Sequence, residues 1–116
     1  MEFYDKKLVE KLKKECHPYY VPDLLFDGSE YKLVRLEVKW AYVACLNVLL
    51  NNALFDNDGY AYFKDDNPML IETLAKLANK KVDSEKMKGY ISELEDVELL
   101  TVSARDVYLK RIEHIF

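Results

Sequence analysis

Apolar residues recur at helical spacing in two consecutive stretches of the second half of the chain, and this pattern predicts a helix-turn-helix. Asn67 and Pro68 favour the start of the first helix, because Asn is a good N-cap and Pro at the first helical position needs no N–H donor. A turn over residues 79–82 follows, and Asp83 or Ser84 caps the second helix. The expected buried positions are Leu70, Ile71, Leu74, Leu77 and Ala78 in the first helix and Met87, Tyr90, Ile91 and Leu94 in the second.

Two stretches rich in β-branched and aliphatic residues follow the second helix. Residues 99–103 and 107–112 flank a short turn at 104–106, which is the pattern of a β-hairpin. Two short helices followed by a hairpin form the plan of a winged helix-turn-helix, whose second helix enters the DNA major groove while the hairpin, or wing, contacts the backbone or minor groove. The sequence therefore predicts a mainly α fold with a small β component (α+β), of the winged helix-turn-helix type.

The first half of the chain predicts a buried central helix and a basic N-terminal helix. Residues 36–51 are apolar on nearly every side, which is typical of a core helix, with Leu36, Trp40, Val43, Ala44 and Leu50 on its main face. Residues 4–16 form an amphipathic helix whose basic side is either a solvated face or a phosphate-contacting arm, and it consists of Lys6, Lys7, Lys11, Lys13 and Lys14.

A short helical turn at 23–26 and a hairpin over 53–63 complete the predicted elements. The hairpin turn, residues 56–59, also suggests a calcium loop, but Leu54 stands where an EF-hand loop needs an acidic residue. We expect one winged-helix domain over residues 1–116. Its parts are an N-terminal helix at 1–17, the core helix and hairpin at 18–66, and the helix-turn-helix with its wing at 67–112.

The charge balance neither favours nor excludes a nucleic-acid partner. The chain carries a formal net charge of −4, whereas nucleic-acid-binding domains commonly have a basic excess. The acidic surplus lies in residues 21–66, where Asp23, Asp27, Glu30, Glu37, Asp56, Asp58, Asp65 and Asp66 outnumber Lys32, Arg35, Lys39 and Lys64. Residues 67–116 are close to neutral, so a DNA-facing patch must come from the local arrangement of their lysines and arginines.

Six residues of the helix-turn-helix and wing are candidates for DNA contact. Lys88 can reach a guanine edge, and the hydroxyls of Ser84 and Ser92 can bond a base or a phosphate. The other three are Lys80 and Lys81, beside a helix N-terminus that attracts phosphate, and Arg105, at a wing tip that can enter a narrow minor groove. Opposing this interpretation, the second helix ends in an acidic stretch with Glu93, Glu95, Asp96 and Glu98.

The sequence offers little for catalysis or metal binding. No nucleophile–base pair can be inferred from spacing, and the three glycines are isolated, so no phosphate-binding loop is present. Cys16, His17, Cys45 and His114 lack the paired spacing of structural zinc sites, and we expect both cysteines to be reduced. We therefore expect a non-enzymatic protein with no metal and no cofactor.

The N-terminus lacks a secretion signal, and no apolar run approaches the roughly 20 residues of a membrane helix. We therefore expect a cytoplasmic protein with no membrane partner.

The order of these elements resembles the N-terminal domain of plasmid replication initiator A proteins of Gram-positive bacteria. The matching residues are Tyr20, Val21, Pro22, Leu25, Phe26, Tyr31, Ala41, Tyr42, Asp56, Gly59, Tyr62, Leu99 and Leu100. The resemblance implies a winged-helix domain that recognises double-stranded repeat DNA at a plasmid origin, often as a homodimer. Arg35 departs from the family, which usually has a small hydroxyl residue there, and family members usually continue into a further domain.

Three functions remain open from the sequence. The leading one is a double-stranded-DNA-binding protein of a plasmid, phage or other mobile element that acts in replication initiation or repression. The second is a small acidic protein that mimics DNA and inhibits a host protein such as a CRISPR nuclease (an anti-CRISPR). The third is a scaffold or dimerisation element whose aromatic contact surface is formed by Tyr4, Tyr19, Tyr20, Tyr60 and Tyr62.

Overall fold

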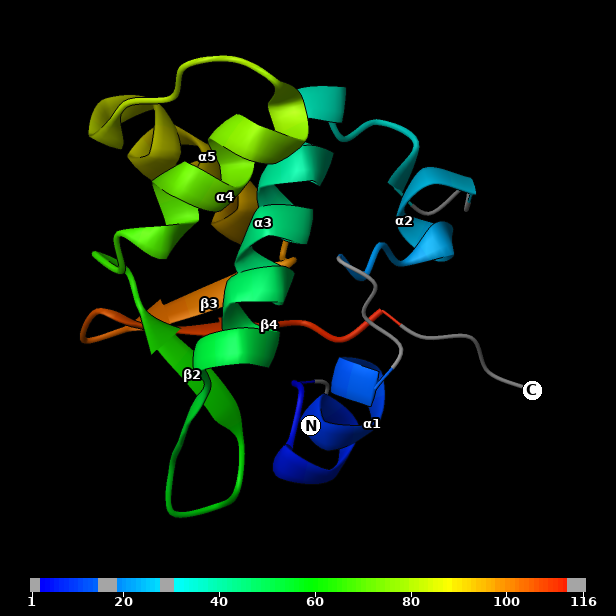
Figure 1. The fold of residues 1–116 in the computed structure, drawn as a ribbon, viewed down its shortest axis with the longest axis vertical. Helices are drawn as coiled ribbons and strands as arrows, with labels where there is room; N and C mark the ends of the chain where they lie inside the picture. The colour runs from blue at the N-terminus through cyan, green and yellow to red at the C-terminus, as the bar shows by residue number, and fades with distance from the viewer. Residues whose placement is uncertain (1–2, 15–18, 28–30, 113–116) are drawn as a thin grey trace.

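The computed structural model describes residues 3–14, 19–27 and 31–112. The expected mainly α fold with a small antiparallel sheet is confirmed (Figure 1). Within the described ranges, the helices are α1 (Lys6–Lys14), α2 (Asp23–Asp27), α3 (Leu36–Asn52), α4 (Met69–Ala78) and α5 (Ser84–Asp96). The strands are β1 (Leu54–Phe55), β2 (Ala61–Lys64), β3 (Leu100–Ser103) and β4 (Asp106–Leu109).

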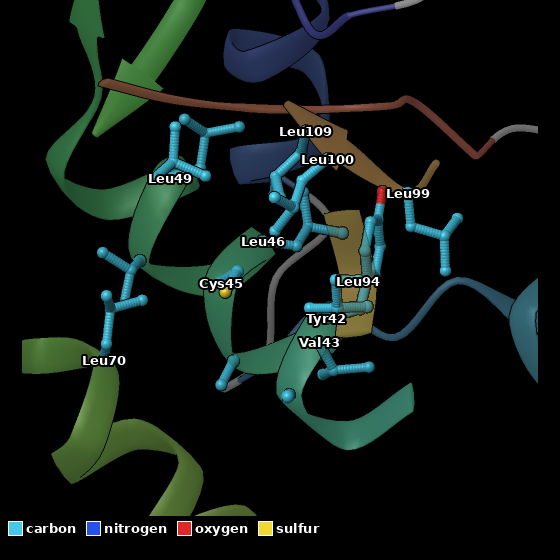
Figure 2. Close-up of a cluster of buried hydrophobic side chains, with 14 of the residues drawn as sticks. Tyr42, Val43, Cys45, Leu46, Leu49, Leu70, Leu94, Leu99, Leu100 and Leu109 are labelled. Carbon is cyan, nitrogen blue, oxygen red and sulfur yellow. The ribbon is translucent and has the colours of Figure 1, made fainter. Parts of the chain in front are cut away.

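Helix α3 is the central element, and it contacts α1, α4, α5 and β2. Every residue from Val38 to Leu50 is buried except Trp40, so the expectation of a helix surrounded by the core is confirmed. Figure 2 shows the side chains of α3 meeting Leu70 from α4, Leu94 from α5 and Leu109 from β4. Burial on all sides explains why this helix has almost no polar face.

The expected main face of α3 was wrong at its first turn. Leu36 is 62 % exposed, because it lines an open pocket between α3, α4 and α5 rather than the closed core. Trp40 lies at the margin of the core rather than inside it, where its ring packs against Phe26 of α2 with 5.1 Å between centroids.

The sheet has the strand order β1-β2-β4-β3, and all neighbouring strands are antiparallel. Val107 of β4 pairs with Phe63 of β2 on one side and with Val102 of β3 on the other. The expected C-terminal hairpin is therefore confirmed as β3 and β4. Its two turn residues, Ala104 and Arg105, have φ angles of 48° and 71°, as in the tight mirror-image turns that suit hairpins.

The first hairpin turn is organised by the carboxylate of Asp56. It accepts hydrogen bonds from the backbone N–H groups of Asp58 and Tyr60, both at 2.9 Å, and from the Tyr108 hydroxyl at 3.0 Å. The Tyr60 N–H is the largest cause of a lowered pKa at Asp56. These contacts are those of a turn, as the sequence predicted.

Helices α4 and α5 are joined by a short turn. The prediction of Asn67 as N-cap and Pro68 as first helical residue was wrong by one position, because Pro68 occupies the N-cap position and α4 begins at Met69. The Asn67 side chain still accepts a hydrogen bond from the Met69 N–H at 2.9 Å. Asn79 ends α4 in the left-handed conformation, and Val82 is buried in the turn. Of the two predicted caps for α5, Asp83 is the one used, since its side chain accepts from the Lys86 N–H at 2.8 Å.

Two buried tyrosines join both ends of the described chain to α3. The backbone N–H of Ile112 donates to the Tyr4 hydroxyl at 3.1 Å, and the Tyr42 hydroxyl donates to the carbonyl of Lys110 at 2.5 Å. The two hydroxyls are 2.9 Å apart, so Tyr4 donates to Tyr42. Tyr4 is fully buried, which excludes it from the aromatic contact surface suggested by the sequence. Helix α1 begins only at Lys6, because the Asp5 carboxylate caps it by accepting the Leu8 N–H at 2.8 Å.

None of the described helices is both long enough and apolar enough to cross a membrane.

Candidate nucleic-acid interface

The outer face of α5 forms one wall of a groove of about 650 Å³. The predicted contact residues Ser84, Lys88 and Ser92 line this groove, because they lie at intervals of four residues along one side of the helix. The buried side of the helix is as predicted, with Met87, Tyr90, Ile91 and Leu94 all directed into the core. Arg105 lines the same groove from the hairpin.

The groove combines an apolar floor with charged edges. The apolar lining consists of Pro68, Leu70, Ile71, Met87, Ile91 and Val102. Lys88 and Arg105 supply positive charge, but Asp65, Asp66 and Glu95 line the groove as well. Four of the six candidate residues therefore meet in one place, beside Glu95, which the sequence already set against DNA contact, and beside Asp65 and Asp66, which it did not connect with them.

The loop between β2 and α4 holds Arg105 at the tip of the hairpin. The guanidinium Nε lies 3.2 Å from the carboxylate of Asp65, and Nη2 lies 2.6 Å from that of Asp66. The Arg105 carbonyl also accepts a hydrogen bond from the Asp65 N–H at 3.0 Å. The Asp65 hydrogen bond, followed by the charge of Asp66, raises the pKa of Arg105, so the arginine stays charged while its charge is balanced locally.

A second ion pair lies next to this one in the same hairpin. Lys64 of β2 pairs with the carboxylate of Asp106 in β4, directly beside the turn. This hydrogen bond raises the pKa of Lys64. The hairpin tip consequently presents two cations paired with three carboxylates rather than a free basic strip.

Lys80 does not join the groove. Its Nζ lies 3.7 Å from the carboxylate of Glu37 in α3, and its side chain lines a different pocket. The Tyr90 hydroxyl, which donates to Glu37 at 2.9 Å, is the largest cause of a lowered pKa at that carboxyl, and Lys80 is the second. Lys81 is exposed in the turn before α5. The Asp83 carboxylate caps the N-terminus of α5 and already accepts the Lys86 N–H that a phosphate would use.

Two carboxylates in the acidic second half of α5 are engaged inside the molecule. Glu93 pairs with Arg35 at 2.7 Å, and Glu95 accepts a hydrogen bond from the Val102 N–H of β3 at 3.4 Å. Asp96 and Glu98 are exposed. The repulsion that these acids would exert on a DNA backbone is therefore reduced mainly at Glu93, where a cation balances the charge.

The described part of the chain contains no group of three or more His, Cys, Asp or Glu side chains placed to hold a metal ion. Cys45 is fully buried, and burial raises the pKa of its thiol to about 12, which makes it a poor nucleophile. Cys16, His17 and His114, named in the zinc hypothesis, lie outside the described residues.

Sequence reasoning missed the carboxylates that hold Arg105. Asp65 and Asp66 precede Arg105 by 40 and 39 residues, and no local pattern connects them to the hairpin. The only signal was their position directly after β2. Because the end of β2 pairs with the start of β4, the residues that follow β2 lie next to the β3–β4 turn.

Solved structures with a similar fold include three DNA-binding or initiator chains. One, described as "N-Terminal domain of DNA binding protein", has a TM-score of 0.62 and 23% identity, over 91% of this chain and 82% of that chain. A second, "Structure of Rep-DNA complex", has a TM-score of 0.60 and 24% identity, over 91% of this chain and 83% of that chain. A third, "Structure of MDR initiator", has a TM-score of 0.57 and 26% identity, over 93% of this chain and 86% of that chain.

The resemblance to replication initiator N-terminal domains that the sequence suggested is confirmed by these structures at the level of the fold. No family model matches the chain, and no curated protein matches it in sequence.

Proposed function

We propose that this chain is a non-enzymatic, double-stranded-DNA-binding module of a mobile element, built as a winged helix-turn-helix. In this proposal α5 is the recognition helix, the β3–β4 hairpin is the wing, and the task is replication initiation or repression. A plasmid or phage protein with this task works where that DNA is held, in the cytoplasm.

The observation that carries the proposal is the convergence of α5 and the hairpin tip on one groove. Ser84, Lys88 and Ser92 line it from the helix, and Arg105 lines it from the tip. Recognition helix and wing are the two parts that a winged-helix protein applies to DNA. Further support comes from the solved structures with the same fold, one of which is described as a Rep–DNA complex.

The chemistry assigns a different task to each residue. Lys88 is placed on the exposed centre of α5 to donate to a guanine edge, whereas Ser84 and Ser92 bond bases or phosphates nearby. Lys81, exposed in the turn, contributes a phosphate contact. Lys80 contributes less, because Glu37 already balances its charge.

The test is binding to labelled duplex DNA, first of random sequence and then of a selected site, between about 50 and 200 mM salt. We expect Lys88→Ala to weaken binding to the selected site while Lys76→Ala does not. Lys76 is the matched control, an exposed lysine of α4 that lies outside the groove. Equal affinity of the parent and a Lys80/Lys81/Lys88/Arg105 quadruple alanine variant would refute this surface.

The acidic lining of the groove favours one second candidate. Asp65, Asp66 and Glu95 present carboxylates where DNA would lie, as in a protein that mimics DNA toward a basic host enzyme such as a CRISPR nuclease. No binding to duplex DNA at the lowest salt, together with capture of a basic nuclease that is lost in an Asp66→Lys variant, would favour this candidate over the first.

A further inference from the structure

Helix α1 carries a concentration of positive charge that the α5 groove lacks. Its nine residues contain five lysines and one glutamate, a net charge of +4 in a chain whose formal net charge is −4. The groove, by contrast, is lined by two cations and three carboxylates, which leaves it with a net charge of −1. Attraction to phosphates supplies essentially all of the non-specific affinity of proteins for DNA, so the groove alone gives this chain little of that affinity.

The lysines of α1 share one exposed face. Val9 and Leu12 are buried on the other side of the helix, which packs against α3. Lys7, Lys11 and Lys14 follow one another at intervals of four and three residues, so they are neighbours on the helix surface. The complete lysine face consists of the exposed residues Lys6, Lys7, Lys11, Lys13 and Lys14.

Folding does not account for this arrangement. The first turn of α1 contains no acidic residue, and Lys6 and Lys7 lie there at the positive end of the helix dipole, where a cation is unfavourable. Lys7 and Lys11, four residues apart, also repel each other. No lysine of this face forms an ion pair with another described residue, whereas Lys64 and Arg105 are both paired with carboxylates. The charge of α1 is therefore available to an anionic partner.

The buried side of α1 restricts what kind of partner this is. A helix that lies in a membrane surface, or in the groove of another protein, uses its apolar face for binding. In α1 that face is occupied, since Val9 is 4 % exposed and Leu12 is 6 % exposed. Only the lysine face remains, and a row of lysines fits the regularly spaced phosphates of a nucleic-acid backbone.

We propose that the lysine face of α1 binds the phosphate backbone of duplex DNA independently of the α5 groove. In Figure 1, α1 lies at the lower end of the molecule and α5 at the upper end, so the two surfaces contact different stretches of backbone. The groove reads the site, and α1 supplies affinity that does not depend on sequence. This inference rests on the duplex-DNA binding of the proposed function, but not on the reading of a site by α5.

Fluorescence anisotropy with a labelled duplex of random sequence, between about 50 and 200 mM salt, tests the proposal. Lys7→Gln with Lys11→Gln removes two phosphate contacts, so the slope of log affinity against log salt becomes shallower by about 1.8. Across this range, affinity then falls about 12 times less than it does for the parent. The matched control is Lys32→Gln with Lys76→Gln, which makes the same change in charge on exposed lysines outside α1 and the groove. Circular dichroism verifies that both variants are folded.

Equal slopes for the α1 variant and the control variant overturn the proposal, and so does a parent that does not bind the random duplex at the lowest salt. Equal slopes combined with binding to phosphatidylserine vesicles that only the α1 variant loses would assign the lysine face to a membrane instead.

The Lys80/Lys81/Lys88/Arg105 quadruple alanine variant separates this proposal from the role of α5. Adding Lys7→Gln and Lys11→Gln to it should make its slope on the random duplex shallower by the same amount, about 1.8. If the quadruple variant binds the selected site as the parent does while the α1 variant loses slope, the role assigned to α5 is wrong and that of α1 is supported.

Discussion

The ion pairs at the hairpin tip make a quantitative prediction about DNA binding. Five charged side chains surround the turn, and their net charge is −1 because Lys64 and Arg105 face Asp65, Asp66 and Asp106. A double variant, Asp65→Asn with Asp66→Asn, changes this local charge to +1 and removes the two partners of the arginine.

The magnitude follows from counterion release. Each phosphate that a protein neutralises on duplex DNA contributes about −0.9 to the slope of log affinity against log salt. An Arg105 released from its carboxylates gains one phosphate contact, so the slope of the double variant is steeper by about 0.9. Between about 50 and 200 mM salt, affinity then falls about 3.5 times more than it does for the parent.

Fluorescence anisotropy with one labelled duplex measures both slopes. The control is Asp58→Asn with Glu72→Gln, which makes the same change in net charge on exposed side chains outside the groove. Exposed ion pairs contribute little to folding, so all variants are expected to remain folded. Equal slopes for the two double variants would show that Arg105 contacts no phosphate. The same conclusion would follow if adding Arg105→Ala to the Asp65→Asn/Asp66→Asn variant left its steeper slope unchanged.

Two further predictions concern stability. Tyr42→Phe removes the hydrogen bonds to the Tyr4 hydroxyl and the Lys110 carbonyl, and we expect it to lower the free energy of unfolding by about 2–4 kcal/mol in urea titrations. An unchanged free energy of unfolding would show that the hydrogen bonds of Tyr42 do not stabilise the fold. Asp56→Asn lowers the melting temperature most near neutral pH, because the Tyr60 N–H holds the pKa of Asp56 below its ordinary 3.8. A lowered pKa stabilises the fold above pH 3.8, and this stabilisation is lost as pH falls through the folded pKa, so the difference between variant and parent should shrink in acid. A difference independent of pH would show that the Asp56 charge is not involved.

The elements that carry local periodicity could be predicted well. The core helix was expected over 36–51 and runs over Leu36–Asn52, because burial on every side leaves an unbroken apolar stretch. The buried side of α5 was also predicted, since Met87, Tyr90, Ile91 and Leu94 follow the helical repeat that sets their direction.

The contacts made by turn and terminal residues could not be predicted. Lys80 lies in a turn, where no repeat fixes direction, and only the packing of α4 on α3 brings it to Glu37. Arg105 was correctly placed at the hairpin tip, but its partners come from a loop about 40 residues earlier. Tyr4 was assigned to an aromatic contact surface, because no local pattern indicates that it is fully buried and bonded to residues near the opposite end of the chain.

The hydrogen bond between Tyr4 and Ile112 has a consequence for how the protein is made. Its two residues are separated by 108 positions, so Tyr4 leaves the ribosome long before its partner has been translated. Contacts of such long sequence separation form late, because they require the intervening chain to close. The backbone of the N-terminal segment can pair earlier with residues 59–61, through the hydrogen bonds from the Lys6 N–H to Gly59 and from the Ala61 N–H to Tyr4. The hydroxyls of Tyr4 and Tyr42 find their backbone partners only when residues 110–112 are available. Synthesis therefore leaves the buried hydroxyls of Tyr4 and Tyr42 without their C-terminal partners until the end of the chain is made, although the first segment is already paired with the β1–β2 hairpin.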